Sequence, residues 1–373
     1  MRQHDSRATA IAKNLLAMLV GLTLTLGLLE GAVRVMASTL GVSPYMQYDE
    51  TLGWTALPNT TKRHRNGSPA FDVSYELNAY GHRGPTYART KPAGTRRIVL
   101  LGDSVGFGWG VDEGQHLAAL LDTGLDTPTG KTEVINLSLS GYGTDQQLLR
   151  LRSEGLAFQP DLVILQLTPN DFDEIQYAFY NQKPKPHFVL GTNGSLELRN
   201  SPVRSEGPQA LDFAANSIPL PFREWLGWHS YAYNLLNEQY YRVSRSYRRG
   251  GVRPYDRFRP ESVALFNRLV QEIKVTLDER HIPLLVVHAA KEISDRQPLR
   301  NPGIPLLDLS GTFAAWEQTH DEPAMFSDGF HWAPRGHHIV ADAVMEALRT
   351  RGDLLTTVRV QESAAPPTGR PAS

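Results

Sequence analysis

Two short segments of the chain carry side chains that could together activate a serine. A Gly-Asp-Ser triplet ends at Ser104, and Asp328 and His331 stand three residues apart near the other end of the chain. A serine hydroxyl is a weak nucleophile at neutral pH, so it needs a base within hydrogen-bond reach and a third group that holds the base in one tautomer. On a single turn, the carboxylate of Asp328 can accept the ring N–H of His331 that faces away from the serine. We therefore predict Ser104 as the nucleophile, His331 as the base and Asp328 as the group that orients the base.

The nucleophile segment is expected to follow a buried strand. Residues 97–103 form an apolar run that ends in a glycine-rich turn. Two further strands, expected at 132–138 and 161–167, lead into loops that contain Gly141 and Asn170. The C-terminal ends of parallel strands are where open α/β sheets place their active sites. We therefore expect the three loops to meet at one edge of a sheet.

The same loops offer hydrogen-bond donors for an oxyanion. A tetrahedral intermediate needs two or three donors fixed where its negative oxygen will form. The backbone N–H groups of Ser104 and Gly141 and the side-chain amide of Asn170 each stand just past a predicted strand. Glycine at position 141 lets the backbone approach closely. We expect these three donors to converge on one point.

With these segments the chain resembles the SGNH (GDSL-like) hydrolase superfamily. Four short blocks of that family carry a serine, a glycine, an asparagine and a histidine, which here would be Ser104, Gly141, Asn170 and His331. The third block of the family usually reads Gly-x-Asn-Asp, and in this chain Thr168 stands where the glycine would be. The departure concerns the shape of the loop more than its chemistry.

The resemblance covers residues 96–171 and 261–350. A preamble at 52–54, 78–84 and 91–94 also matches a membrane-tethered bacterial branch of the superfamily. The resemblance implies a flavodoxin-like fold with a parallel five-stranded sheet. It further implies hydrolysis of acyl esters through an acyl-enzyme, without a cofactor and without a metal.

A rival interpretation exists for the nucleophile segment. Residues 102–106 also fit Gly-x-Ser-x-Gly, the nucleophile elbow of α/β-hydrolases. Such an elbow follows several strands, whereas one clear core strand precedes Ser104. The acid and base of α/β-hydrolases come from separate loops, whereas Asp328 and His331 share one turn. The order of the chain therefore favours the first interpretation.

Predicted strands and helices alternate along the core of the chain. This alternation is typical of a parallel sheet covered by helices on both faces, and it predicts a three-layer α/β/α sandwich. Besides the strands already given, strands are expected at 282–289 and 304–309, and helices at about 115–123, 144–156, 261–280 and 334–349.

The segments outside the core suggest a domain organisation. We expect a cytoplasmic N-terminus at 1–14 and a transmembrane signal anchor at 15–37. An extended arm at 38–95, with one strand at 71–77, is expected to lead into a hydrolase domain at 96–350 that carries an insertion at 172–260. The tail at 351–373 is expected to be disordered.

The insertion at 172–260 is rich in aromatic residues and ends in a basic run. An insertion that leaves the catalytic face is a natural lid or substrate platform. Aromatic side chains beside arginines suit stacking on sugars or contact with anionic lipid headgroups. A helical hairpin whose aromatic residues form its own core is the alternative. The residues are Tyr177, Phe179, Tyr180, Phe222, Trp225, Trp228, Tyr231, Tyr233, Tyr240, Tyr241, Arg242, Arg245, Arg248, Arg249 and Arg253.

The N-terminal apolar stretch at 15–37 is long enough to cross a bilayer core of roughly 30 Å. Glu30 and Arg34 can form an i, i+4 pair near its end, where charged side chains reach the interface most easily. Basic residues precede the stretch and, apart from Arg34, none follows until Lys62, so the positive-inside rule places the large domain on the periplasmic side of an inner membrane. A cleaved signal peptide ending near 35–37 and a buried core helix are the alternatives.

Composition excludes several other classes. A net charge of −1 and a pI near 6.9 give no electrostatic case for binding nucleic acid. The absence of cysteine excludes disulfides, thiol catalysis and thiolate metal sites.

The remaining polar motifs are interpreted structurally. Residues 106–110 lack the lysine of a phosphate-binding loop and are expected to open a helix after the serine. His337 and His338 are expected on a helix after Pro334, pointing away from Asp328.

Asp103 and Asp171 are acidic neighbours of the predicted site, and we expect both to make loop and helix-cap hydrogen bonds.

Together the observations predict a membrane-anchored serine esterase that acts on an acyl ester of a glycan or a lipid. One alternative is an O-acyltransferase of extracellular polysaccharide modification, in which a sugar hydroxyl replaces water. The other is a catalytically silent binding or assembly protein that keeps the fold.

Overall fold

The computed structural model describes residues 2–40, 45–67, 69–128, 130–180, 183–204, 258–299 and 303–350, with short stretches between 218 and 240. The chain divides into two compact units. The first comprises Met1–Pro44 and Ser205–Arg253, and the second comprises Tyr45–Arg204 and Pro254–Ser373. Several residues of the sequence predictions lie outside the described part: the tail at 351–373, Trp228, Tyr241, Arg242, Arg245, Arg248, Arg249, Arg253 and the side chain of Phe179.

The second unit is built on a five-stranded sheet with the order β13-β12-β7-β5-β6, in which every neighbouring pair is parallel. The five strands predicted from the sequence are therefore confirmed, within a few residues at their ends. Their bounds are β5 (Thr95–Leu101), β6 (Lys131–Asn136), β7 (Leu162–Gln166), β12 (Leu284–His288) and β13 (Leu306–Asp308).

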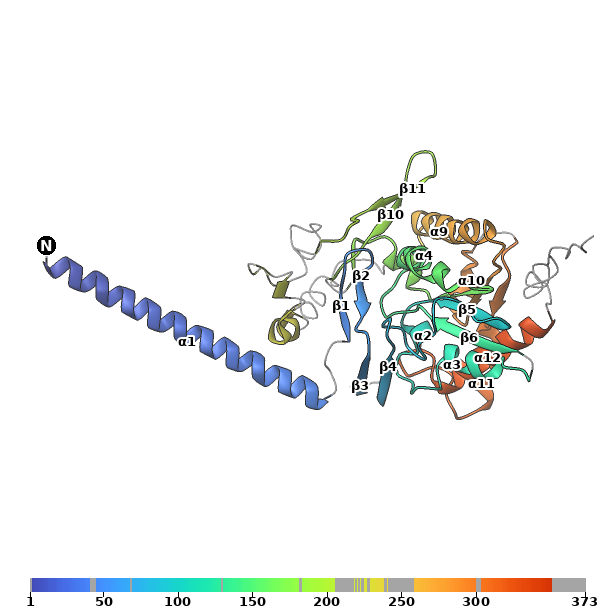
Figure 1. The fold of residues 1–373 in the computed structure, drawn as a ribbon, viewed down its shortest axis with the longest axis horizontal. Coiled ribbons are helices and arrows are strands. Elements are labelled where there is room, and N and C mark those ends of the chain that lie inside the picture. The colour runs from blue at the N-terminus through green and yellow to red at the C-terminus, as the bar shows by residue number, and fades with distance from the viewer. Residues whose placement is uncertain are drawn as a thin grey trace, which may run out of the picture. The chain divides into compact units, whose positions relative to one another are not determined.

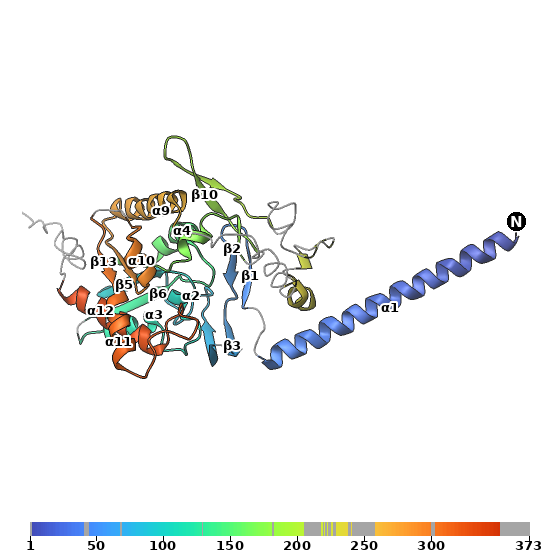
Figure 2. The ribbon, with the colours of Figure 1, turned by 180° about the vertical axis from the view of Figure 1, so that it is seen from behind.

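Helices cover both faces of this sheet (Figures 1 and 2). Side chains alternate along β5, so Val99 and Leu101 enter one hydrophobic core whereas Ile98 and Leu100 enter the other. The predicted three-layer α/β/α sandwich is confirmed. One face is covered by α4 (Thr144–Ser153), η1 (Gly155–Phe158) and α9 (Pro260–Asp278), and the other by α3 (Leu117–Gly124), α11 (Ser310–Thr319) and α12 (Pro334–Thr350).

The predicted arm contains two antiparallel hairpins. The first pairs β1 (Met46–Asp49) with β2 (Gly53–Ala56), and the second pairs β3 (Thr60–Gly67) with β4 (Ala70–Leu77). The strand expected at 71–77 is present as β4, but the other three strands were not expected. The reason is visible in β3, whose half-buried and exposed positions alternate although nearly all its side chains are polar, so it gives no apolar pattern.

The predicted insertion begins with short elements of the second unit. These are α5 (Asp171–Glu174), β8 (Phe179–Tyr180), β9 (Lys183–Pro184), β10 (His187–Leu190) and β11 (Leu196–Arg199). The strands form two antiparallel hairpins, β8 with β9 and β10 with β11.

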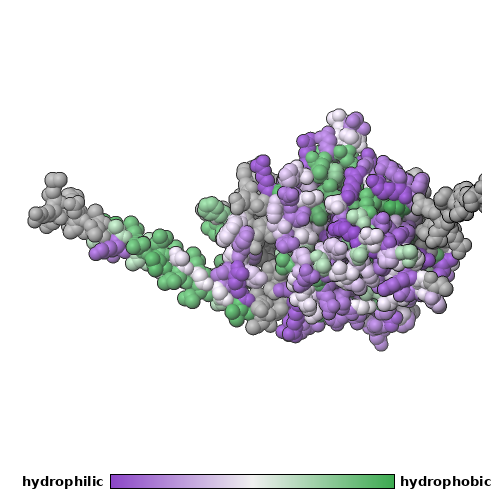
Figure 3. All heavy atoms as spheres, in the orientation of Figure 1, coloured by the Kyte–Doolittle hydropathy of each residue, from purple (hydrophilic) through white to green (hydrophobic). Residues whose placement is uncertain are grey.

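The first unit contains one long helix, α1 (Arg2–Leu40). Its segment Ala10–Met36 is long and apolar enough to cross a membrane, a property that signal sequences share. Hydrophobic residues cover much of its visible surface (Figure 3). Residues 231–237 of the same unit are also helical.

Candidate active site

The structure brings the three predicted catalytic side chains into one hydrogen-bonded series. Ser104 is the first residue of the short helix α2 (Ser104–Phe107), which begins three residues after β5 ends. Its Oγ lies 2.9 Å from Nε2 of His331, and Nδ1 of His331 lies 2.7 Å from Oδ2 of Asp328. Both distances are those of hydrogen bonds, so the three side chains have the geometry predicted from the sequence.

Asp328 is held by its own loop. Its Oδ1 accepts the backbone N–H groups of Phe330 at 2.9 Å and of His331 at 3.0 Å. Partial burial acts to raise the pKa of this carboxyl group, but the hydrogen bond from the His331 ring and those from the two backbone N–H groups outweigh it. The pKa of Asp328 therefore lies below its usual value of 3.8, and the group stays ionised at neutral pH.

Aromatic rings fix the plane of the His331 imidazole. The ring of Trp109 stacks on it with a centroid distance of 4.1 Å, and Phe330 meets it edge-on at 4.8 Å. Trp109 is packed in turn against Phe71 of β4 at 4.6 Å. The β3-β4 hairpin therefore supports His331 through Trp109, a contact that was not predicted from the sequence.

The glycine of the second loop is required by both its conformation and its surroundings. Gly141 has a φ of +83°, in the left-handed region. A Cβ atom there would stand 2.3 Å from the ring of Tyr180. The neighbouring Ser140 is tied to the arm, because its carbonyl accepts the indole N–H of Trp54 at 3.3 Å and its Oγ lies 3.0 Å from the Tyr45 hydroxyl.

The amide of Asn170 faces two carboxyl groups. Its Nδ2 donates to Oε1 of Glu174 at 2.7 Å and to Oδ2 of Asp103 at 3.2 Å. Its Oδ1 is buried and has no hydrogen-bond partner in the described part of the chain. Glu174 was missed in the sequence analysis, although its position four residues after Asn170 on a helical turn was a usable signal.

Asp103 and Asp171 make the loop and cap hydrogen bonds expected of them. Asp103 accepts the N–H of Val105 at 2.8 Å at the start of α2, and the Thr168 hydroxyl at 2.7 Å. Asp171 accepts the N–H of Thr168 at 2.8 Å. Thr168, the residue that departs from the family pattern, therefore joins the nucleophile loop to the Asn170 loop.

Burial sets the charge of this cluster. It raises the pKa of Glu174 and of Asp171 well above their usual values, and the negative charge of Asp103 adds to both shifts. A carboxyl group has an oxygen that can accept the Asn170 amide whether it is protonated or ionised, so this hydrogen bond at 2.7 Å does not depend on the charge of Glu174.

The two remaining motifs have structural roles. Residues 106–110 form the turn that ends α2, in which Gly108 and Gly110 have φ values of +85° and +81°. The helix expected after Pro334 is present, and the buried His337 accepts the N–H of Leu117 through Nδ1 at 3.2 Å. Within the described residues, no group of three His, Asp or Glu side chains is placed to hold a metal ion.

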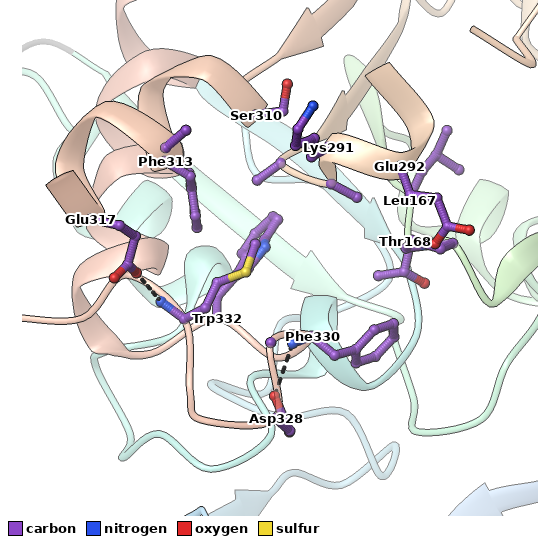
Figure 4. A pocket seen from close by; sticks show the side chains of 16 residues that line it. Leu167, Thr168, Lys291, Glu292, Ser310, Phe313, Glu317, Asp328, Phe330 and Trp332 are labelled. Atoms are coloured by element: carbon purple, nitrogen blue, oxygen red, sulfur yellow. Dashed lines mark hydrogen bonds between the residues drawn. The ribbon is translucent and has the colours of Figure 1, made fainter. Parts of the chain in front are cut away.

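A cavity of about 450 Å³ lies beside the loop that carries Asp328. Thr168, Asp328 and Phe330 border it, as Figure 4 shows. Its other walls come from Ala289–Glu292, where α10 (Lys291–Arg296) begins, and from Phe313 and Glu317 of α11. The volume is within the usual range for a small-molecule site, roughly 300–1,000 Å³.

No protein-family model matches the chain, and no curated protein matches it. Solved structures of similar fold include a two-domain esterase active on acetylated mannans, at 14% identity and a TM-score of 0.40, over 75% of this chain. The match spans 54% of that esterase. Another is the lipase/acylhydrolase from Enterococcus faecalis, at 15% identity and a TM-score of 0.35, over 69% of this chain and 96% of that one.

A third similar structure is a putative lipolytic protein of the G-D-S-L family from Desulfitobacterium hafniense. It is 11% identical with a TM-score of 0.36, over 68% of this chain and 99% of that one.

Proposed function

We propose that the chain is a serine esterase that hydrolyses acyl esters through an acyl-enzyme. The observation that carries the proposal is the unbroken series from Ser104 Oγ through His331 to Asp328, at 2.9 and 2.7 Å. Each distance is within reach for proton transfer. A carboxylate on Nδ1 leaves Nε2 unprotonated and facing the serine, which is the tautomer that a general base requires.

The proposed reaction has two halves. Ser104 Oγ attacks the ester carbonyl while His331 Nε2 takes its proton, and collapse of the tetrahedral intermediate returns that proton to the leaving alcohol. A water molecule then attacks the acyl-enzyme, with His331 again as base, and the carboxylic acid is released. Asp328 stabilises the imidazolium that forms twice in each cycle.

We assign the oxyanion to the N–H groups of Ser104 and Gly141 and to one N–H of the Asn170 amide. That N–H lies 3.2 Å from Asp103 and would turn to the oxyanion, while Glu174 holds the other N–H at 2.7 Å. Ser104 opens α2, so its N–H has no partner within that helix. The tie between Ser140 and Trp54 supports the neighbouring Gly141. The two backbone donors are fixed in advance, and such donors are worth more than donors that must reorganise.

The role that we assign to Glu174 is to position the Asn170 amide. Glu174→Ala removes the acceptor at 2.7 Å, so the amide loses its orientation, and kcat on p-nitrophenyl acetate should fall about tenfold with KM little changed. Glu174→Gln has the same size and keeps a carbonyl acceptor, so it should retain most of the activity. The same loss of kcat in both variants would contradict this role, and so would wild-type kcat in both.

We further propose that residues 15–37 anchor the enzyme in the inner membrane as a single span, with 1–14 in the cytoplasm and the 96–350 domain in the periplasm. The apolar segment Ala10–Met36 supports the span, and the basic residues before it support the direction.

The cavity beside Asp328, with apolar walls at Phe313 and Phe330, would receive one part of an ester borne by a glycan or a lipid.

The first test is covalent labelling of the detergent-solubilised full-length protein with a fluorophosphonate. We expect an activated Ser104 Oγ to displace fluoride and retain the phosphonyl group. Ser104→Ala should lose the label, whereas Ser195→Ala, in the turn between β10 and β11, should label like the wild type. A folded wild type without label, or equal labelling of Ser104→Ala, would show that the proposal is wrong.

A further inference from the structure

The carboxylate of Glu30 on α1 is occupied by a second segment of the first unit. It accepts hydrogen bonds from the Ser230 hydroxyl at 2.8 Å, the N–H of Tyr231 at 2.9 Å and the N–H of Ala232 at 3.0 Å. Residues 231–237 are helical, so Glu30 stands at the N-terminal end of that helix. A carboxylate is favourable there because it satisfies N–H groups that have no partner within the helix.

Arg34 completes the contact. It pairs with Glu30 at 2.7 Å and donates to the carbonyl of His229 at 2.6 Å. Its guanidinium group also lies 4.7 Å from the centre of the Tyr231 ring. We call Glu30, Arg34 and residues 229–232 the clamp.

The clamp lies within the segment expected to cross the membrane. Glu30 and Arg34 both belong to the apolar stretch Ala10–Met36. Ionisable side chains inside a membrane are costly unless they are partnered. The partners of this pair come from residues 195 to 202 positions later. Among the α1 side chains described from 10 to 36, only Glu30 and Val33 are partly covered. The second segment is therefore attached near the C-terminal end of the span.

The attached segment exposes large apolar side chains. Phe222 is 80% exposed, Trp225 47%, Leu235 41% and Leu236 56%. We call these four residues the apolar seat. All four lie within one short stretch of the sequence, from 222 to 236, and tryptophan is enriched where a membrane meets water.

We propose that the apolar seat inserts into the outer boundary of the bilayer that α1 spans, held at that depth by the clamp. The occupant of the seat is lipid, because the clamp fixes the segment to a helix whose own exposed face is apolar. The inference rests on the proposed membrane anchoring. It adds a second membrane contact, made by a segment far from the anchor in sequence.

The chain contains no cysteine, so a single introduced cysteine can carry a unique fluorescent label. Leu236→Cys and Phe222→Cys report on the seat, Leu24→Cys reports on the span, and Val275→Cys, a 40% exposed residue of α9, reports on the second unit. The full-length variants are labelled with an environment-sensitive dye. They are then reconstituted in phosphatidylcholine and phosphatidylglycerol vesicles with and without brominated acyl chains.

Brominated lipid should quench the labels at 24, 222 and 236 by at least twofold and leave the label at 275 unchanged. Quenching at 24 without quenching at 222 and 236 would overturn the seat and leave the anchor intact. No quenching at 24 would overturn the anchoring, and the seat with it.

A variant of the clamp tests whether the clamp itself, and not mere closeness to α1, holds the apolar seat in the bilayer. Glu30→Ala should reduce quenching at 236 at least twofold and leave quenching at 24 unchanged. Thr25→Ala is the matched control, because the Thr25 hydroxyl donates to the carbonyl of Gly21 in its own helix, at 2.8 Å, and to no other described residue. Unchanged quenching at 236 in Glu30→Ala would show that the clamp does not hold the seat.

Discussion

Replacing His331 with alanine is expected to lower kcat on p-nitrophenyl acetate by about 10⁶-fold. The variant removes the group 2.9 Å from Ser104 Oγ, so no base accepts the proton during attack and no acid donates it to the leaving alcohol. The measurement is kcat with the purified full-length protein, beside the thermal midpoint as a check on folding.

His338→Ala is the matched control. His338 lies on α12, seven residues further along the chain, and its side chain is exposed. It should keep wild-type kcat. The double variant Ser104→Ala with His331→Ala should be no less active than either single variant, because the two side chains act as one unit. Additive losses would mean that the serine and the histidine work separately, which the proposed mechanism does not allow.

That Ser104, His331 and Asp328 come together could be predicted from sequence because they stand in short segments with clear local patterns. Their catalytic roles stay a prediction. The apolar runs before Ser104 and Asn170 are fully buried in the sheet, and parallel strands bring their C-terminal ends to one edge. Asp328 and His331 were predictable as a pair because one turn holds both. None of these steps required knowledge of contacts between distant segments.

The supporting contacts could not be predicted in the same way. Trp54 reaches Ser140 across 86 positions, and Phe71 reaches the Trp109 that stacks on His331. Neither β2 nor β3 has an apolar run that would reveal a strand. Glu174 is an ordinary acidic residue of a helix until the fold buries it beside Asn170.

The pair of Glu30 and Arg34 shows how a correct local prediction can miss the larger contact. Their i, i+4 spacing predicted the ion pair, which is present. Spacing on one helix cannot reveal that the same carboxylate accepts three hydrogen bonds from Ser230, Tyr231 and Ala232. Such partners depend on tertiary structure and not on the local pattern.

Replacing Asp328 with asparagine is expected to lower kcat about 10⁴-fold while leaving the shape of the site unchanged. The reason lies in how the carboxylate is held. Its Oδ1 already accepts the N–H groups of Phe330 and His331, so the asparagine will place its carbonyl oxygen there. Its NH₂ group then faces Nδ1 of His331, where Oδ2 now stands at 2.7 Å. Nδ1 must become the acceptor, and the ring proton moves to Nε2, which faces the serine and can no longer take its proton.

The measurement is kcat together with the rate of fluorophosphonate labelling, because both depend on the same proton transfer. Asp342→Asn, an exposed carboxylate of α12, is the matched control and should behave like the wild type. Asp328→Ala frees the ring to adopt either tautomer, so it should lose less activity than Asp328→Asn. An asparagine variant with near-normal kcat would mean that Asp328 only shapes its loop and that another group sets the tautomer of His331.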